Sequence, residues 1–312
     1  MEAIRVRRLN HANLHVECDF GQAAEIKEFF SFFVPGYQWM PAFKRRIWDG
    51  KIRLFDTNTG ELPAGLIHHL VKYIESRGYN YELVKTKYGT PLEEQRPDPK
   101  EVVQFIKTLN LPFDPRDYQF IAIMEALHRT RGILLSPTGS GKSLIIYVLA
   151  QYWLQMLTDG LRYPEAGKVL VIVPTTSLVE QMHNDFVQYG CSEKAIHRIY
   201  SGKDKTFNQA ICISTWQSIY KLPKDWYQQF GMVVGDECHG FKSKSLMNIM
   251  NKATEAKYRY GTTGTLDGTQ THELVLQGLF GKTFKVTTTK KLQDSGTLAQ
   301  LNINRLVLDY SS

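Results

Sequence analysis

Alternation of apolar and polar residues over positions 4 to 18 predicts two strands near the start of the chain. Leu14, Val16 and Cys18 share one face, and the polar residues between them share the other, as in a strand with one buried side. A helical period follows and should end at Pro35-Gly36. Five residues form the apolar side of this helix: Ala24, Ile26, Phe29, Phe30 and Phe33.

The next stretch predicts a strand, a second helix and a last strand. Residues 51–55 have the pattern of a strand that closes on a turn at 56–60, which is rich in Asp, Asn, Thr and Gly. Apolar residues then recur at helical spacing from Leu66 to Ile74, and Gly78 should end that helix. With the alternating residues that follow, the first 90 residues predict a small α+β domain.

The composition changes after this domain. Four residues that disfavour regular structure lie among charged residues, at Gly89, Pro91, Pro97 and Pro99, so we place a linker and a lead-in helix at 91–112. Near-continuous apolar runs follow, typical of a parallel sheet buried on both faces. They lie at 132–135, 168–173, 211–213 and 232–234. The predicted fold class is therefore α/β, with a parallel-sheet lobe after a small α+β domain.

The strongest chemical signal is the sequence SPTGSGKS at 136–143, between a predicted strand and a predicted helix. Gly139 and Gly141 allow backbone N–H groups to surround phosphates, Lys142 can reach the outer phosphates, and the Ser143 hydroxyl can bind Mg²⁺. A chance Gly/Ser turn is the alternative. The expected cofactors are ATP and Mg²⁺, with nucleotide contacts from Pro137, Thr138, Gly139, Ser140, Gly141, Lys142 and Ser143.

Two adjacent carboxylates follow the apolar strand at 232–235. Ligands bind at the carboxyl ends of parallel strands, so Asp236 should reach the Mg²⁺ and Glu237 should polarise the attacking water. These two carboxylates and Lys142 are the predicted catalytic groups. A solvated acidic loop is one alternative, and a metal site at Cys238-His239 is another, although no further ligands accompany that pair.

A P-loop of the form PTGSGKS followed by DECH resembles the superfamily 2 helicases. The resemblance implies a RecA-like ATP-binding lobe, placed here at 113–286, and an ATP-dependent helicase or translocase. It also implies that Arg116 and Gln119 recognise adenine, and that Thr263, Gly264 and Thr265 couple hydrolysis to movement through the catalytic-site His239. The nucleic-acid contacts it implies in this lobe are Pro174, Thr175, Thr176, Gln181, Thr215 and Gln217. Each of these later matches could alone be a turn or a core strand, and it is their order and spacing that favour the helicase.

Segments 47–54, 228–232 and 279–281 resemble, more closely, the UvsW family of recombination helicases from T-even-type phages. This resemblance covers nearly the whole chain. It implies a motor that acts on branched or duplex DNA in recombination, repair and fork processing, largely without sequence preference. A RecG-like or restriction-type translocase, or an RNA helicase, would share the motor motifs but not the first domain.

Residues 39–53 combine basic and aromatic side chains, with five Lys or Arg against one acid, Asp49. Cations can neutralise phosphates and exposed rings can stack on bases, so this segment is predicted to contact DNA. In the alternative, Trp39, Phe43 and Trp48 are core residues with a rim of solvated charge, and Trp48 is the ring that best fits a core. The predicted contacts are Trp39, Lys44, Arg45, Arg46, Lys51 and Arg53.

Charge and composition agree with this function. The 312 residues carry a formal charge of +7, which favours a polyanionic partner. No apolar run reaches the ~18 residues that a membrane span needs, so we expect no membrane association and a cytoplasmic location, the host cytoplasm if the protein is phage-encoded. The four cysteines are scattered, so we expect reduced thiols and no zinc.

Helicases of this superfamily need a second RecA-like lobe, and the sequence shows none. Residues 287–312 are predicted to be a connector and the start of that lobe, with a first strand near Thr287 to Leu292. Because the second lobe supplies an arginine for phosphoryl transfer, worth ~10³-fold or more in rate, the isolated chain should be weakly active or inactive. The competing hypothesis is an ATP-gated DNA-binding fragment without turnover.

Overall fold

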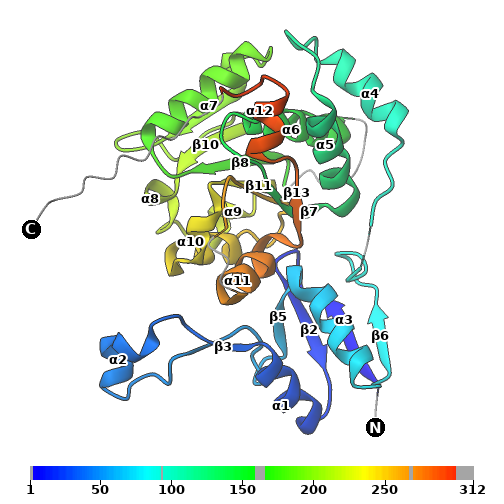
Figure 1. Ribbon diagram of the computed structural model, residues 1–312, viewed down its shortest axis with the longest axis vertical. Coiled ribbons are helices and arrows are strands. Elements are labelled where there is room, and N and C mark those ends of the chain that lie inside the picture. The colour runs from blue at the N-terminus through cyan, green and yellow to red at the C-terminus, as the bar shows by residue number, and fades with distance from the viewer. Residues whose placement is uncertain (1–2, 93, 159–165, 267–269, 300–312) are drawn as a thin grey trace, which may run out of the picture.

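The computed structural model describes residues 3–92, 94–158, 166–266 and 270–299. They form a small N-terminal unit and a larger lobe that lies beside it (Figure 1). No helix in these ranges is both long enough and apolar enough to cross a membrane.

The N-terminal unit is a four-stranded sheet covered on one face. Its order is β5-β2-β1-β6, with β1 and β6 parallel and the other neighbours antiparallel. Alternate strand residues pack with apolar side chains of two helices, which confirms the predicted faces of the strands and of the second helix. The predicted apolar face of the first helix is wrong in part, because Ile26 and Phe30 are buried but Ala24, Phe29 and Phe33 are exposed. The elements are β1 (Ile4–Arg8), β2 (Asn13–Glu17), α1 (Phe20–Phe29), β5 (Glu61–Pro63), α3 (Ile67–Ser76) and β6 (Tyr81–Val84).

The first helix is shorter than its apolar pattern predicts. It ends at Phe29, and Phe33, predicted to lie on this helix, belongs to strand β3 (Ser31–Phe33). β3 pairs antiparallel with β4 (Lys51–Arg53), so ladder hydrogen bonds replace the helical ones. Phe33 is 50% exposed. The helical prediction assumed that every apolar residue at this spacing is buried on one helix face, and Phe33 is not.

The β3–β4 hairpin projects from the unit as an arm (Figure 1). Near its far end are the 3-10 turn η1 (Tyr37–Trp39) and the short helix α2 (Pro41–Lys44). Tyr37 stacks on Phe33 and meets Phe43 edge-on, both at 4.7 Å between ring centres. The arm therefore has a small aromatic cluster of its own.

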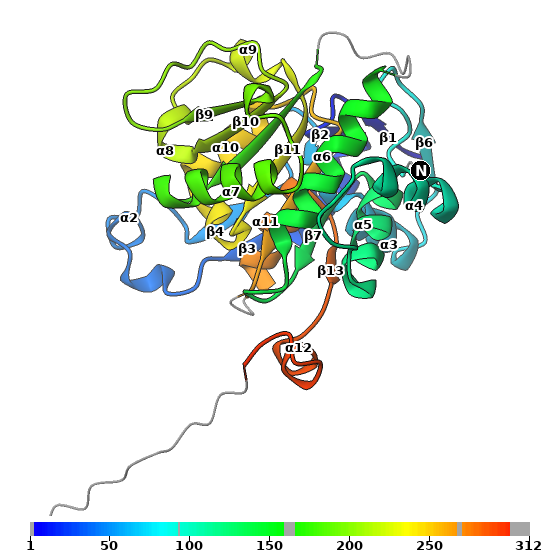
Figure 2. The ribbon, with the colours of Figure 1, turned by 90° about the horizontal axis from the view of Figure 1, so that it is seen from above.

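The larger lobe is a seven-stranded sheet between two helical layers (Figures 1 and 2). Its order is β13-β7-β12-β11-β8-β10-β9, and every neighbouring pair is parallel. The strands are β7 (Arg131–Leu135), β8 (Lys168–Val173), β9 (Ile196–Ile199), β10 (Ile211–Thr215), β11 (Phe230–Asp236), β12 (Tyr258–Thr263) and β13 (Thr283–Lys285). This is the expected RecA-like parallel-sheet lobe.

Both faces of the sheet carry apolar side chains and are covered by helices, as is usual for a parallel sheet. One face packs against α4 (Pro99–Thr108), α5 (Asp117–Arg129), α6 (Lys142–Thr158) and α7 (Thr176–Gln188). The other packs against α8 (Trp216–Ile219), α9 (Lys224–Tyr227), α10 (Lys244–Lys252) and α11 (Gln270–Phe280).

The two units are in direct contact. Gly65, in the 3-10 turn η2 (Ala64–Leu66), lies so close to α11 that a Cβ there would be 1.9 Å from the carbonyl oxygen of Gln277. Across the same interface, Arg131 Nη2 donates a hydrogen bond to the carbonyl of His11 at 2.7 Å. A residue larger than glycine at this turn would force the backbones apart.

The predicted strand near Thr287 to Leu292 is wrong. This segment contains helix α12 (Thr289–Asp294), because the Thr288 hydroxyl accepts the Lys291 N–H as an N-cap and Leu292 is buried. Residues 300–312, which complete the predicted start of a second lobe, lie outside the described residues.

Candidate nucleotide and nucleic-acid sites

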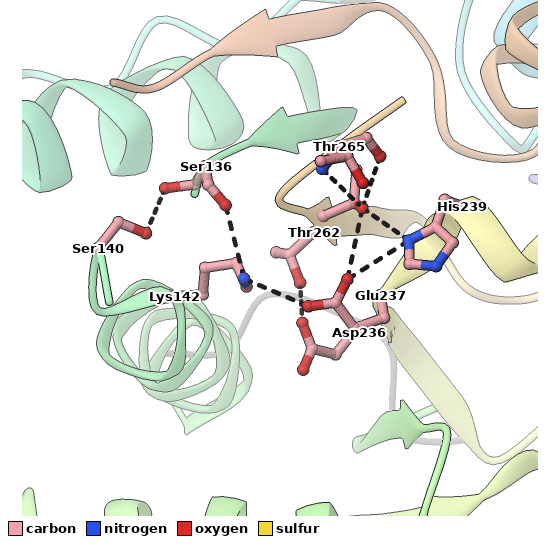
Figure 3. A network of polar contacts seen from close by, with 9 residues as sticks. Ser136, Ser140, Lys142, Asp236, Glu237, His239, Thr262 and Thr265 are labelled. Carbon is pink, nitrogen blue, oxygen red and sulfur yellow. Dashed lines mark hydrogen bonds and ion pairs between the residues drawn. The ribbon is translucent and has the colours of Figure 1, made fainter. Parts of the chain in front are cut away.

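The P-loop joins strand β7 to helix α6 at the carboxyl edge of the sheet (Figure 3). Gly139 and Gly141 have φ values of +80° and +76°, which favour glycine. The Ser136 hydroxyl donates to the Ser140 hydroxyl at 2.6 Å and closes the loop from inside. This backbone conformation suits a loop whose N–H groups surround an anion.

Lys142 lies between the P-loop and the two carboxylates of Asp236 and Glu237, here called the acidic motif (Figure 3). Its Nζ is 3.3 Å from Glu237 Oε1 and 3.5 Å from the carbonyl oxygen of Ser136. An ammonium group has three donors, so two interactions leave one for a phosphate oxygen. The cation is thus held in place before a nucleotide arrives.

Asp236 ends strand β11 and is only 7% exposed. Burial raises the pKa of its carboxyl, while the Thr262 hydroxyl, which donates to Oδ1 at 2.6 Å, and the charge of Lys142 act in the opposite direction. A buried carboxylate next to a cation site gains from a divalent ion. Asp236 and Ser143 line the same cavity, and their carboxylate and hydroxyl oxygens are ligands of the kind that Mg²⁺ prefers.

Glu237 and His239 form a polar network with strand β12 (Figure 3). Glu237 has φ +50°, a left-handed value that is costly for a residue with a side chain and recurs at functional sites. His239 Nδ1 lies 2.9 Å from Thr263 Oγ1 and 3.4 Å from Glu237 Oε2. The Thr263 hydroxyl donates to the Thr265 carbonyl at 2.9 Å, and the Thr263 carbonyl accepts from Ser136 N at 2.8 Å. Thr263 thus links the acidic motif to the P-loop.

Gln119 is 4% exposed and braces the P-loop. Its Nε2 donates to the Ser140 carbonyl at 2.9 Å, and its Oε1 accepts from Arg116 N at 2.8 Å. The Arg116 guanidinium donates to the Tyr118 hydroxyl, which donates to the same Ser140 carbonyl. Sequence reasoning missed this bracing role, and adenine recognition by Arg116 and Gln119 stays a prediction.

A cavity of about 280 Å³ lies between the P-loop, the acidic motif and helix α7. Its size is near the lower end of small-ligand sites, ~300 Å³. Gln181, predicted to contact nucleic acid, lines this cavity. The lining residues are Thr138, Gly139, Gly141, Lys142, Ser143, Leu178, Gln181, Met182, Asp185, Asp236 and Glu237.

Tyr189, which follows the end of α7, makes a second contact that no sequence pattern indicates. It is buried, and its hydroxyl lies 3.0 Å from Ser143 Oγ. The hydroxyl that would bind Mg²⁺ therefore has a fixed partner. Nothing in the spacing between positions 143 and 189 could indicate this contact.

The two segments predicted to track nucleic acid meet at the same sheet edge. Gln217 Nε2 donates to the Pro174 carbonyl at 3.3 Å. Thr175 and Thr176 are exposed, whereas Thr215 is buried and its hydroxyl lies 2.9 Å from Ser218 Oγ. The edge therefore offers exposed hydroxyl and amide groups from Thr175, Thr176 and Gln217, whereas the Thr215 hydroxyl is not exposed.

The hairpin arm carries the basic and aromatic residues. Trp39 is 77% exposed, which rules it out as a core residue, and Lys44 Nζ lies 5.4 Å from its ring centre. Trp48 is half-buried, and its indole donates to the Lys51 carbonyl at 2.8 Å. Arg45 is exposed. The arm therefore presents an accessible ring together with cations.

The five cations of the arm differ in their partners. Lys51 pairs with Glu28 at 2.9 Å, and Arg53 pairs with Asp49. Hydrogen bonds from Arg53, and then from the Lys51 backbone, lower the pKa of Asp49 to about 2. Among the described residues, no carboxylate pairs with the remaining three, which are Lys44, Arg45 and Arg46.

Comparison with known proteins agrees with both units. The family model "DNA helicase UvsW, N-terminal" matches residues 3–84, and "Type III restriction enzyme, res subunit" matches residues 112–268. The ATP-dependent DNA helicase uvsW of Enterobacteria phage T4 is 35% identical over 314 residues, which cover 98% of this chain and 61% of that protein. The chain belongs to the UvsW helicase family.

Two crystal structures of T4 UvsW extend the match to three dimensions. One aligns with a TM-score of 0.80 at 33% identity and covers 91% of this chain and 100% of that chain. The other aligns with a TM-score of 0.79 at 32% identity over 92% of this chain and 57% of that chain. The DNA 3'-5' translocase XPB2 of Sulfurisphaera tokodaii is 29% identical over 152 residues, which cover 48% of this chain and 30% of that protein. The chain spans less than two thirds of these curated relatives.

Proposed function

We propose that this UvsW-family chain is part of an ATP-dependent DNA helicase or translocase that acts on branched DNA in recombination, repair and replication-fork processing. The observation that carries the proposal is the meeting of Lys142, Asp236 and Glu237 around one cavity. A second RecA-like lobe would complete the motor by supplying an arginine for phosphoryl transfer. The T4 relative, described as an ATP-dependent DNA helicase, favours this chemistry.

Each polar group around the cavity has a distinct task in the proposed reaction. Lys142 would neutralise the outer phosphates, and Ser143 and Asp236 would hold Mg²⁺, which would supply charge stabilisation at the transferred phosphoryl group. Glu237 orients the attacking water and takes its proton. The His239–Thr263 contact then couples ATP hydrolysis at this site to movement of strand β12.

Calorimetric titration with Mg·ATP tests the nucleotide half of the proposal. Lys142→Ala should lose most of the affinity, because a buried phosphate then loses its cation. Lys203→Ala, which removes an exposed lysine from a loop outside the cavity, is the matched control and should bind normally. Equal affinity for the two variants would refute the assignment.

The hairpin arm is the proposed DNA grip. Lys44, Arg45 and Arg46 have no acidic partner among the described residues, and Trp39 is exposed beside them. Free cations next to an accessible ring suit contact with phosphates and unpaired bases. Since Lys51 and Arg53 are already paired with acids, we assign them a smaller share of the binding.

Salt-dependent fluorescence anisotropy with duplex DNA tests this grip. If each of the three cations meets one phosphate, replacing all three by alanine should reduce the slope of log K against log salt by roughly three. The matched control removes three cations elsewhere in the unit: Arg5, Arg7 and Arg77. An unchanged slope in the arm variant would leave the motor lobe as the DNA-contacting surface.

The same preparations separate a motor from an ATP-gated binding module. Turnover that DNA stimulates, and that Lys142→Ala abolishes, identifies a motor. Binding of both ligands with hydrolysis no faster than in that variant identifies a module that depends on a second lobe.

A further inference from the structure

The segment that follows strand β13 returns to the P-loop. Strand β13 pairs with β7, the strand that leads into the P-loop, and beyond this pairing the Val286 N–H donates to the Leu135 carbonyl at 2.9 Å. The chain therefore leaves the sheet beside the loop that begins at Ser136. Helix α12 comes next and lies outside the two helical layers (Figure 2).

The end of α12 turns the chain back. Gly296 has φ +71°, and its N–H donates to the Gln293 carbonyl at 3.0 Å. The Thr297 N–H donates to the Leu292 carbonyl at 2.8 Å, which completes a Schellman motif. The Leu298 N–H donates to the same Leu292 carbonyl at 3.0 Å. The backbone of Leu298 is thus fixed relative to the helix.

The side chain of Leu298 lies against Gly139 of the P-loop. A Cβ on Gly139 would be 2.6 Å from Leu298 Cδ2, so the leucine occupies the space that a side chain at position 139 would need. Leu298 is half-buried. Among the described residues, those that line the nucleotide cavity include Gly139 but not Leu298. The leucine therefore contacts the loop without forming part of the cavity wall.

This apolar contact adds to the hydrogen bonds that brace the loop. The Ser136 hydroxyl donates to the Ser140 hydroxyl at 2.6 Å, and Gln119 Nε2 donates to the Ser140 carbonyl at 2.9 Å. Gly139 lies between the two serines and has no side chain of its own with which to be held. Because glycine has more backbone conformations available than other residues, a neighbour that packs against Gly139 restricts the most variable part of the loop.

We propose that Leu298 is a positioning residue for the nucleotide, because it holds Gly139 in the conformation in which the P-loop N–H groups surround the phosphates. The inference rests on the proposed function, since it requires ATP to bind at this loop. A loop that is ordered before its ligand arrives loses less conformational entropy on binding. Removal of the contact should therefore weaken Mg·ATP binding although no group that touches the nucleotide is removed.

Calorimetric titration of the chain with Mg·ATP tests the proposal. Leu298→Ala should raise Kd about three- to tenfold, as expected when binding must also order a short segment. Leu298→Met keeps a long apolar side chain and should restore most of the affinity. Val103→Ala, which truncates another partly exposed apolar side chain of the same lobe, is the matched control and should bind normally. An unchanged Kd for Leu298→Ala would overturn the proposal, and so would a lower Kd, because the leucine would then obstruct the loop.

A second variant displaces Leu298 without deleting it. Gly296→Ala places a side chain on a left-handed residue, where no atom of the described residues lies within 4 Å of the new Cβ, so the strain is in the turn itself. Kd should rise here too. Gly78→Ala is the matched control, because Gly78 has φ +70°, equally open surroundings and the same place in the Schellman motif after α3. Equal Kd values for the two glycine variants would count against the positioning role.

Lys142→Ala in the same titration distinguishes the two levels of inference. If this variant binds Mg·ATP as tightly as the unaltered chain, the proposed function itself fails. If Lys142→Ala loses affinity while Leu298→Ala does not, the nucleotide site stands and only the positioning role of Leu298 fails.

Discussion

Replacing Gly65 by alanine should weaken the packing between the N-terminal unit and the larger, RecA-like lobe. The new methyl would lie 1.9 Å from the Gln277 carbonyl oxygen and 2.8 Å from both the Gly278 carbonyl oxygen and the Gly281 nitrogen. All three are backbone atoms at or just after the end of α11, so no side chain can rotate away. The two backbones must separate by roughly 1.5 Å to reach normal contact.

The expected cost follows from this overlap. Overpacking of a tight core costs about 1 to 3 kcal/mol, and rigid backbone on both sides places Gly65→Ala at the upper end. For a unit of this size, 1 kcal/mol shifts the melting temperature by about 2 to 4 °C. We therefore expect the melting temperature to fall by roughly 5 to 10 °C.

Differential scanning calorimetry measures this change, and limited proteolysis of the linker shows whether the units have separated. Gly21→Ala is the matched control, because its Cβ would approach only the Asp19 side chain, at 3.3 Å, and alanine favours the helix that contains it. If Gly65→Ala melts within a degree of the unaltered chain, the close approach at this interface does not hold the units together.

Three further predictions concern the nucleotide site. In a protein that also contains the second lobe, Glu237→Gln should bind ATP but stop hydrolysing it, and a kcat within about threefold of the parent would move the role of base elsewhere. Because burial raises the pKa of Asp236, its carboxylate takes up a proton earlier on acidification, so calorimetry should show Mg·ATP affinity falling at a higher pH than an exposed aspartate would give. An Asp236→Asn variant should lack this step. Tyr189→Phe should weaken Mg²⁺-dependent ATP binding roughly two- to tenfold by removing one hydrogen bond to Ser143, while Tyr147→Phe, a neighbouring buried tyrosine, should not. Equal Mg²⁺ dependence in these two variants would exclude a positioning role for Tyr189.

The RecA-like lobe could be predicted from the sequence because its signals are local. A run of apolar residues that ends in a glycine-rich loop or a carboxylate pair fixes both a buried parallel strand and the chemistry at its end, as at β7 and β11. The family resemblance then assigned the order of the later motifs. Because β7 and β11 belong to one parallel sheet, their carboxyl ends lie at the same edge. The P-loop with Lys142 and the carboxylates of Asp236 and Glu237 therefore come together there.

Other features could not be predicted, because they depend on distant partners. Phe33 has helical spacing, but its segment pairs with strand β4, where Lys51 lies opposite Phe33. The engagement of Gln119 with the P-loop, and of Tyr189 with Ser143, depends on how helices cross above the sheet. The strand predicted near Thr287 failed because the Thr288 cap favours a helix.

The arm and the glycine contact together have a mechanical consequence. Gly65 brings the backbone of the small unit directly against α11, so we expect movement of the larger lobe to carry the small unit with it. If the larger lobe tilts during ATP binding and hydrolysis, the projecting hairpin should move with it. The displacement should be greatest at the end of the hairpin that lies farthest from the lobe. The exposed indole of Trp39 lies near that end, so in the proposed helicase its fluorescence should report this displacement.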